Sequence, residues 1–279
     1  MLLVLLTGLL VSTRFFEPVM AAEHPEALFA STGGMKEIFL EHKGGKIHAV
    51  EAGIEGGPLF VFIHGSPGSW HDFTQAADSF RFHEKARLLF VDRPGYGDSE
   101  LPHTGMLQDQ TDPIWALIQA RRRPGQPVFV AGHSYGGPVA MKLGLDHADA
   151  MNGVLLVAPT ISATMQAPRW YNRIAGSWLV NPLLGKWLRN SNREMMALPE
   201  QLVEMGTRLP GFALPIVYIQ GGQDRLVPSE SLNHFVNLCT NCRLEVITHD
   251  PMDHFVPWSD PELIDQGFRM LLSTLASDQ

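Results

Sequence analysis

The sequence has few basic residues, only two cysteines and no long apolar run. Lysine and arginine number 21 against 29 acidic residues, and the formal net charge of −8 argues against a nucleic-acid partner. Neither a Gly-x-x-x-x-Gly-Lys phosphate loop nor a dinucleotide-binding fingerprint is present, so nucleotide chemistry is not supported. The remaining composition, 45% hydrophobic and 18% charged over 279 residues, is typical of one large globular domain.

The most apolar stretch lies at residues 1–11 and is too short to span a membrane as a conventional helix. Its eleven residues would reach about 16 Å, against a hydrocarbon core of roughly 30 Å. Val19-Met-Ala21 fits the small-residue pattern of a cleavage site, although no Lys or Arg precedes the apolar run. We interpret residues 1–21 as a secretory signal peptide or a membrane-associated leader, with membrane association through residues 1–13. This favours an exported (periplasmic or secreted) or membrane-associated protein and leaves a cytoplasmic location open.

A serine lies at a sharp turn between a predicted strand and a predicted helix. The apolar run 128–131 leads into Gly132-His-Ser134-Tyr-Gly136, and a helical pattern follows from Pro138. The two glycines let the backbone pass close to its neighbours where a Cβ would clash. Such a turn pushes the serine hydroxyl out over the end of the sheet, so the segment predicts a nucleophile elbow at Ser134.

A serine hydroxyl is a poor nucleophile at neutral pH and requires a base and an orienting acid. Asp224 follows the apolar strand predicted at 215–220, and His254 follows the strand predicted at 243–248. Since reactive groups in such proteins lie past the carboxyl ends of strands, we expect Ser134, Asp224 and His254 to form a triad.

The segment from His249 to His254 also offers competing assignments. His249 is an alternative base, and Asp250 or Asp253 is an alternative acid. Two histidines and two aspartates in six residues are compatible with a metal site as well, but a proline interrupts them and no second ligand cluster is apparent. We therefore expect no metal.

The order of elements predicts an α/β fold. Two leading strands at 36–41 and 46–52, joined by a turn at Gly44-Gly45, precede an alternation of strands and helices. This alternation predicts a mostly parallel central sheet with helices on both faces. The further strands are expected at 58–63, 87–91, 127–131 and 153–158, and the helices near 70–84, 106–122 and 136–148.

Three further segments complete a family pattern. They are His64-Gly-Ser-Pro-Gly68, Asp92-Arg-Pro-Gly-Tyr-Gly-Asp-Ser99 and His254-Phe-Val-Pro-Trp258. With the elbow and the order serine, aspartate, histidine, they resemble the α/β-hydrolase family, in its serine-nucleophile, esterase- or lipase-like branch with a helical cap. The resemblance runs from about Met35 to the C-terminus.

The resemblance implies a mechanism and an oxyanion hole. An ester-type acyl bond would be cleaved through an acyl-enzyme intermediate, with a small-molecule acyl substrate and no cofactor. The backbone N–H groups of Ser66 and Tyr135 would stabilise the oxyanion, since Pro67 cannot donate, and His64 and Gly65 would support the loop. A C–C bond hydrolase, a perhydrolase or an acyltransferase with the same triad remains an alternative, and a catalytically silent binding protein is a remote one.

The alternation breaks at residues 160–213, and in the resembled family an insertion here forms a helical cap. We call residues 160–213 the cap segment and expect the core to comprise 22–159 and 214–279. We expect most of its tryptophans to pack the cap onto the core, one or two to face an apolar acyl pocket, and the basic side chains to lie mostly at the rim. The tryptophans are Trp170, Trp178 and Trp187.

The two cysteines, Cys239 and Cys242, lie between a predicted helix and a predicted strand. A redox Cys-x-x-Cys pair normally begins a helix, so this position favours a structural disulfide if the protein is exported.

Overall fold

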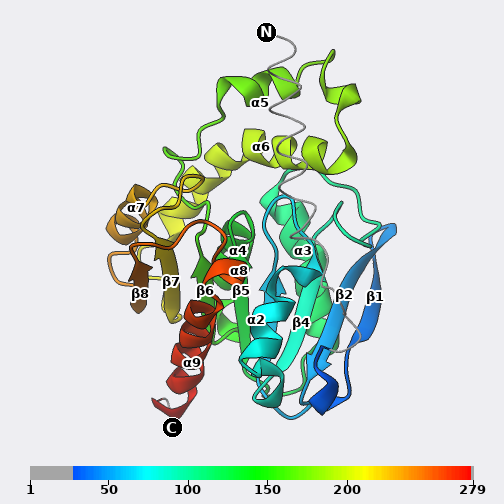
Figure 1. The fold of residues 1–279 in the computed structure, drawn as a ribbon, viewed down its shortest axis with the longest axis vertical. Helices are drawn as coiled ribbons and strands as arrows, with labels where there is room; N and C mark the ends of the chain where they lie inside the picture. The colour runs from blue at the N-terminus through cyan, green and yellow to red at the C-terminus, as the bar shows by residue number, and fades with distance from the viewer. Residues whose placement is uncertain (1–27, 278–279) are drawn as a thin grey trace.

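The computed structural model describes residues 28–277. Its centre is one eight-stranded sheet with strand order β1-β2-β4-β3-β5-β6-β7-β8 (Figure 1). Strands β1 and β2 pair antiparallel, as do β2 and β4, and all other neighbours are parallel. The predicted α/β class with a mostly parallel sheet is therefore confirmed. The predicted leader at 1–21, with its membrane association at 1–13, lies outside the described residues.

All eight predicted strands are present. They are β1 (Lys36–His42), β2 (Gly45–Gly53), β3 (Leu59–Ile63), β4 (Arg87–Asp92), β5 (Val128–His133), β6 (Gly153–Val157), β7 (Ile216–Gly221) and β8 (Leu244–His249). The first hairpin turn differs by one residue from the prediction, because Gly45 pairs with His42 inside the ladder. The turn is formed by Lys43 and Gly44, which have φ angles of 41° and 89°.

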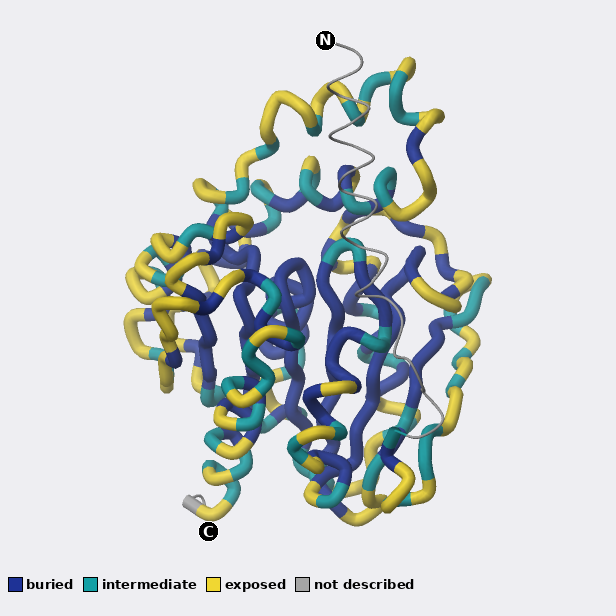
Figure 2. Tube along the Cα trace, in the orientation of Figure 1, coloured by how far each residue is buried: buried dark blue, intermediate teal, exposed yellow. Residues whose placement is uncertain are grey.

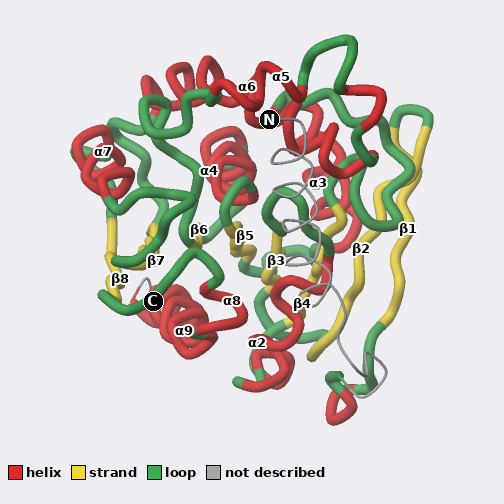
Figure 3. Tube along the Cα trace, turned by 45° about the horizontal axis from the view of Figure 1, so that its top comes forward, coloured by secondary structure: helices red, strands yellow, loops and turns green. Residues whose placement is uncertain are grey.

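Two layers of helices cover the sheet, and each shields its own hydrophobic core (Figures 2 and 3). One face packs against α3 (Leu107–Arg121), α4 (Gly136–Asp146) and α7 (Glu230–Leu238), and the other against α2 (Thr74–Ser79), α8 (Val256–Ser259) and α9 (Pro261–Ser277). Central strands alternate between the two cores: Val61 lies in the first, whereas Phe60 and Phe62 lie in the second. Burial on both faces explains why these strands are apolar throughout.

The single helix expected near 70–84 is instead three short elements. These are the 3₁₀ turn η3 (Trp70–Phe73), α2, and the 3₁₀ turn η4 (Phe82–Glu84). Arg81 adopts a left-handed φ of 56° between the last two, which ends α2. The break lets Phe82 stack on Phe268 of α9, with ring centroids 4.2 Å apart. Tertiary packing thus overrides the local helical pattern.

The cap segment lies over the carboxyl ends of the strands (Figure 1). It contains α5 (Trp170–Ala175), the 3₁₀ turn η6 (Asn181–Leu183) and α6 (Lys186–Arg208). The expectation for its tryptophans was wrong: they neither pack the segment onto the core nor face the pocket. Trp170, Trp178 and Trp187 are 64%, 83% and 47% exposed. Among residues 28–277, no helix is both long and apolar enough to cross a bilayer.

Candidate active site

Ser134 lies at the turn between β5 and α4, in a conformation that L-residues rarely adopt. Its φ is 52°, in the left-handed region, and the flanking glycines explain how the turn is possible. A Cβ on Gly132 would lie 2.1 Å from the carbonyl oxygen of Gly136, and one on Gly136 would lie 2.2 Å from that of Ile63. The predicted sharp turn is therefore present, and Ser134 is held at the carboxyl end of the central strand.

The loop after β3 lies directly against this serine. A Cβ on Gly65 would approach the Cβ of Ser134 to 3.2 Å, so only glycine fits easily. The backbone N–H groups of Ser66 and Tyr135 donate no hydrogen bond to any residue within 28–277. Two free donors beside a serine hydroxyl have the character of an oxyanion site.

The structure brings His254 and Asp224 together, as the sequence predicts. Their Nδ1 and Oδ2 atoms are 2.7 Å apart, and both residues are buried. The second carboxylate oxygen, Oδ1, accepts the backbone N–H groups of Leu226 and Val227 at 2.8 and 2.7 Å. Each oxygen of Asp224 thus has a separate function, and the carboxylate orientation is fixed.

The alternatives at 249–254 are not supported by this geometry. Asp253 accepts hydrogen bonds from the Phe255 N–H, just before α8, and from the hydroxyl of Ser259, the last residue of α8. His249 is half exposed and lies 3.8 Å from Asp260. His254 and Ser134 line one pocket, although within residues 28–277 no hydrogen bond joins them. Such a bond often forms only when the substrate binds.

His64 and His133 are buried beneath the site, and both are neutral at ordinary pH. Burial and nearby positive charge lower the pKa of each to about 3. His133 Nε2 lies 2.9 Å from the carbonyl oxygen of His254, and His64 Nε2 accepts the backbone N–H of Arg93 at 3.0 Å. These side chains fix the backbone positions of the loops around the site.

A buried ion pair between the loop after β4 and helix α6 was not predicted from the sequence. The Arg93 guanidinium donates to Glu194 at 2.5 Å and to the carbonyl oxygens of His64 and Gly65 at 3.0 and 2.6 Å. Tyr96 donates to the other Glu194 oxygen at 2.9 Å. Burial alone would raise the pKa of Glu194, but the Arg93 charge and the hydrogen bonds from His103 and Arg93 lower it below its ordinary value. Arg93 lies in the family-like segment Asp92–Ser99 described above, whereas its partner Glu194 lies 101 positions later in the sequence.

Asp72 of η3 is buried against the loop after β3. Its Oδ1 accepts the backbone N–H of Ser69 at 3.3 Å, and Asp72 lines the pocket. Burial raises its pKa from 3.8 to about 7, because the hydrogen bonds that it accepts do not offset the loss of solvent.

One group with the spacing of metal ligands, His48, Asp92 and Asp98, lies among the described residues, outside the pocket. The two Asp92 oxygens already accept backbone N–H groups, from Trp70 at 2.8 Å and from Asp98 at 3.0 Å. His48 Nδ1 lies 2.7 Å from Asp92 Oδ2. These contacts join β2, η3 and the loop after β4, which accounts for the cluster as loop structure.

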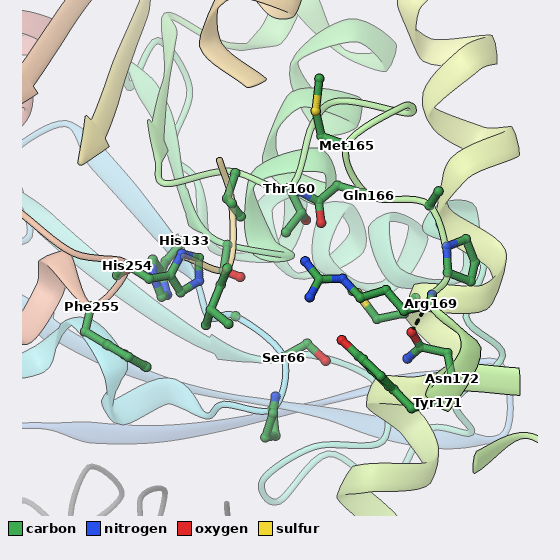
Figure 4. A pocket seen from close by; sticks show the side chains of 18 of the residues that line it. Ser66, His133, Thr160, Met165, Gln166, Arg169, Tyr171, Asn172, His254 and Phe255 are labelled. Atoms are coloured by element: carbon green, nitrogen blue, oxygen red, sulfur yellow. Dashed lines mark hydrogen bonds between the residues drawn. The ribbon is translucent and has the colours of Figure 1, made fainter. Parts of the chain in front are cut away.

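The pocket above Ser134 has a volume of about 210 Å³ and lies between the loops of the core and the cap segment. Figure 4 shows Met165, Gln166, Arg169 and Tyr171 of the cap segment on the side opposite His254. The volume is small compared with the roughly 300–1,000 Å³ of common ligand sites. Arg169 is an exposed residue whose side chain extends toward the cavity, as expected for a basic side chain at the rim.

Cys239 and Cys242 form a disulfide at the end of α7, with Cα atoms 5.3 Å apart. The bond closes the turn into β8 and is remote from the pocket residues.

A serine at a left-handed turn above a parallel sheet, with a carboxylate-bound histidine in the same pocket, is the arrangement of hydrolytic α/β enzymes. The comparisons with known proteins agree: the model of the Alpha/beta hydrolase family matches residues 60–266. The chain belongs to the α/β hydrolase family.

Individual relatives show how far the likeness extends. The chain is 32% identical over 127 residues to probable lysophospholipase BODYGUARD 4 of Arabidopsis thaliana, covering 44% of this chain and 30% of that protein. It is 29% identical over 148 residues to epoxide hydrolase 3 of Xenopus tropicalis, covering 50% and 38%. The crystal structure of a membrane phospholipase A, described as a bacterial virulence factor, has a TM-score of 0.66 at 20% identity over 99% of this chain and 98% of that one. The matched stretch spans well under half the length of either curated relative, and the structural likeness shows the fold.

Proposed function

We propose that this hydrolase is a serine enzyme that cleaves an ester-type acyl bond through an acyl-enzyme intermediate. The observation that carries the proposal is the left-handed Ser134, which shares a pocket with the Asp224-bound His254. This arrangement supplies a nucleophile, a base and an orienting acid in one place.

His254 takes the proton of the Ser134 hydroxyl as the serine oxygen attacks the carbonyl carbon. Asp224 holds the imidazole tautomer through Nδ1 and stabilises the imidazolium that forms. The N–H groups of Ser66 and Tyr135 bind the developing oxyanion. His254 then protonates the leaving alcohol, and water, activated by the same histidine, releases the acid.

The residue at the elbow separates this proposal from the activity named for one relative. In the family, aspartate at the elbow accompanies dehalogenase and epoxide-hydrolase activity, whereas serine accompanies acyl transfer to water. This chain has Ser134, and no described carboxylate replaces it at the turn. An acyl substrate is therefore favoured over an epoxide, although epoxide hydrolase 3 is among the matched relatives.

A fluorophosphonate probe tests the proposal directly, because it forms a covalent bond only with an activated serine. We expect one probe per chain, attached at Ser134 by peptide mass spectrometry, and loss of labelling in Ser134→Ala. In the same preparation, kcat for a short acyl ester should fall by a factor on the order of 10⁴ or more. Full labelling or substantial turnover by Ser134→Ala would refute the assignment of the nucleophile.

A further inference from the structure

Two residues that line the pocket carry polar side-chain atoms for which the serine chemistry has no use. Thr160 Oγ1 and Gln166 Nε2 are buried and have no hydrogen-bond partner in the described part of the chain. Thr160 is 5% exposed, and its backbone N–H donates to the Ser134 carbonyl oxygen at 3.0 Å. Because an unpaired buried polar group is destabilising, such groups in a cavity wall indicate a polar ligand.

A cation faces the same space. Arg169 is exposed and lines the pocket, and its guanidinium extends toward the cavity between Gln166 and Tyr171 in the view of Figure 4. It forms no ion pair with any residue between 28 and 277. Among the lining residues that the structure describes, Asp72 carries the one carboxyl group, and it hydrogen-bonds to the loop after β3. The guanidinium charge is thus not neutralised by the pocket wall.

The backbone beneath this cation is fixed. The Arg169 N–H donates to Asn172 Oδ1 at 2.9 Å. Asn172 Nδ2 donates to Asn192 Oδ1 at 3.0 Å, and Asn192 Nδ2 donates back to the Asn172 carbonyl oxygen at 3.1 Å. These bonds join α5 to α6, so the guanidinium extends from an anchored helix end, which lowers the entropic cost of holding an anion.

We propose that Thr160, Gln166 and Arg169 form a subsite for an anionic oxygen group, a carboxylate or a phosphate, carried by the ester substrate. The guanidinium supplies two parallel N–H donors that match the geometry of either group, and the Gln166 amide supplies a further donor. The inference rests on the ester hydrolase function proposed above. It narrows the substrate class to esters with a negative charge remote from the scissile carbonyl.

Two esters with acid parts of equal length isolate the effect of the negative charge on kcat/KM. Monoethyl adipate and ethyl hexanoate both have a six-carbon acid part, and the first ends in a carboxylate where the second ends in a methyl group. The wild-type enzyme should show the higher kcat/KM with monoethyl adipate, and 1 M NaCl should reduce this preference. A second pair, 1-hexanoylglycerol 3-phosphate and 1-hexanoylglycerol, places the anion on the alcohol part. Comparison of the two pairs shows whether the subsite binds a carboxylate on the acid part or a phosphate on the alcohol part.

The variant Arg169→Gln tests the cation. The ratio of kcat/KM for the anionic ester to that for its neutral partner should fall by about 10- to 100-fold, the range for a charge-assisted hydrogen bond. Arg169→Lys should retain part of the preference, because it keeps the charge but loses the paired donors. The matched control is Arg173→Gln, a second exposed arginine that lies in α5 but outside the pocket lining, which should leave the ratio unchanged.

An equal loss with both esters of a pair, or no preference in the wild-type enzyme with either pair, would overturn the subsite. Binding of the same esters to Ser134→Ala, measured by calorimetry, tests it without turnover. Tighter binding of the anionic ester, weakened by Arg169→Gln, would support the subsite even if the probe failed to label Ser134. Absence of labelling alone would count against the proposed function.

Discussion

The carboxylate of Glu194, on α6, accepts a 2.5 Å hydrogen bond from the guanidinium of Arg93, and both side chains are completely buried. The same guanidinium holds the carbonyl oxygens of His64 and Gly65 in the loop beside Ser134. The cap segment is therefore connected, through one arginine, to the loop that we assign to the oxyanion site. This connection gives α6 a structural influence on the catalytic centre without contact with the reacting atoms.

Replacing Glu194 should affect both stability and turnover. Glu194→Gln leaves the Arg93 charge buried without its anion, which should lower the free energy of unfolding by about 3–5 kcal/mol. In folded protein, kcat should fall more than KM rises, because the loop acts on the oxyanion and not on the bound ester. Urea denaturation and steady-state kinetics measure the two effects, with Glu200→Gln on the exposed side of α6 as control. Unchanged kcat in folded Glu194→Gln would contradict the coupling.

The acid is tested by comparing Asp224 with Asp253. Asp224→Asn should keep the fold but lower kcat by about 10⁴-fold, because an amide in this position favours the wrong imidazole tautomer. Asp253→Asn keeps the side-chain oxygen that accepts the Phe255 N–H and the Ser259 hydroxyl and loses only the charge, so it should change turnover little. Circular dichroism and ester kinetics distinguish the cases. If Asp253→Asn were the more damaging to kcat, our choice of acid would be wrong.

Asp72 should make stability depend on pH. Because its pKa is raised from 3.8 to about 7 in the fold, the folded protein keeps a proton that the unfolded chain releases. Its contribution is fully present below about pH 4 and is lost as the pH rises through 7, a change on the order of a few kcal/mol. Asp72→Asn should flatten the pH dependence of the unfolding free energy between about pH 4 and 7, whereas the exposed Asp149→Asn should not. An unaltered slope in Asp72→Asn would show that another group titrates.

The acyl preference should depend on the methionines of the pocket. Met195 lines the cavity, so Met195→Ala should enlarge it and shift relative kcat/KM toward longer acyl chains by roughly tenfold. Trp178, at 83% exposure and outside the lining, is the control, and Trp178→Ala should keep the parent profile. Hydrolysis of a series of ethyl esters gives both profiles. A shift with Trp178→Ala alone would mean that the cap segment closes differently on substrate.

The remaining prediction is that the protein is exported and that its two cysteines become oxidised to a disulfide. Protein recovered from an oxidising compartment should begin near Ala22 and should carry the Cys239–Cys242 disulfide. Intact mass, with and without reduction before alkylation, measures both features. A retained leader, or two alkylated thiols in unreduced protein, would count against it. Because the bond closes a loop of four residues, its loss should cost only about 2 kcal/mol.

The sequence alone determined the sheet and the placement of Ser134, Asp224 and His254 at strand ends. Strands buried on both faces are apolar throughout, and the Gly132 and Gly136 positions leave one feasible path for the turn, so these features are local and visible in the sequence. The helix expected near 70–84 was not determined locally, because packing of Phe82 against α9 broke it into shorter pieces.

Only the tertiary structure decided which cap residues face the pocket. The sequence predicted that most cap tryptophans pack onto the core and that one or two face an apolar pocket, but the direction of a side chain in the cap segment depends on how that segment docks. The fold leaves Trp178 in solvent and places the exposed Arg169 among the residues that line the pocket. It also pairs Arg93 with Glu194 over 101 positions, a long-range contact with no periodic or local signal. Burial makes that pairing necessary, since an isolated charge in the interior would be far too costly.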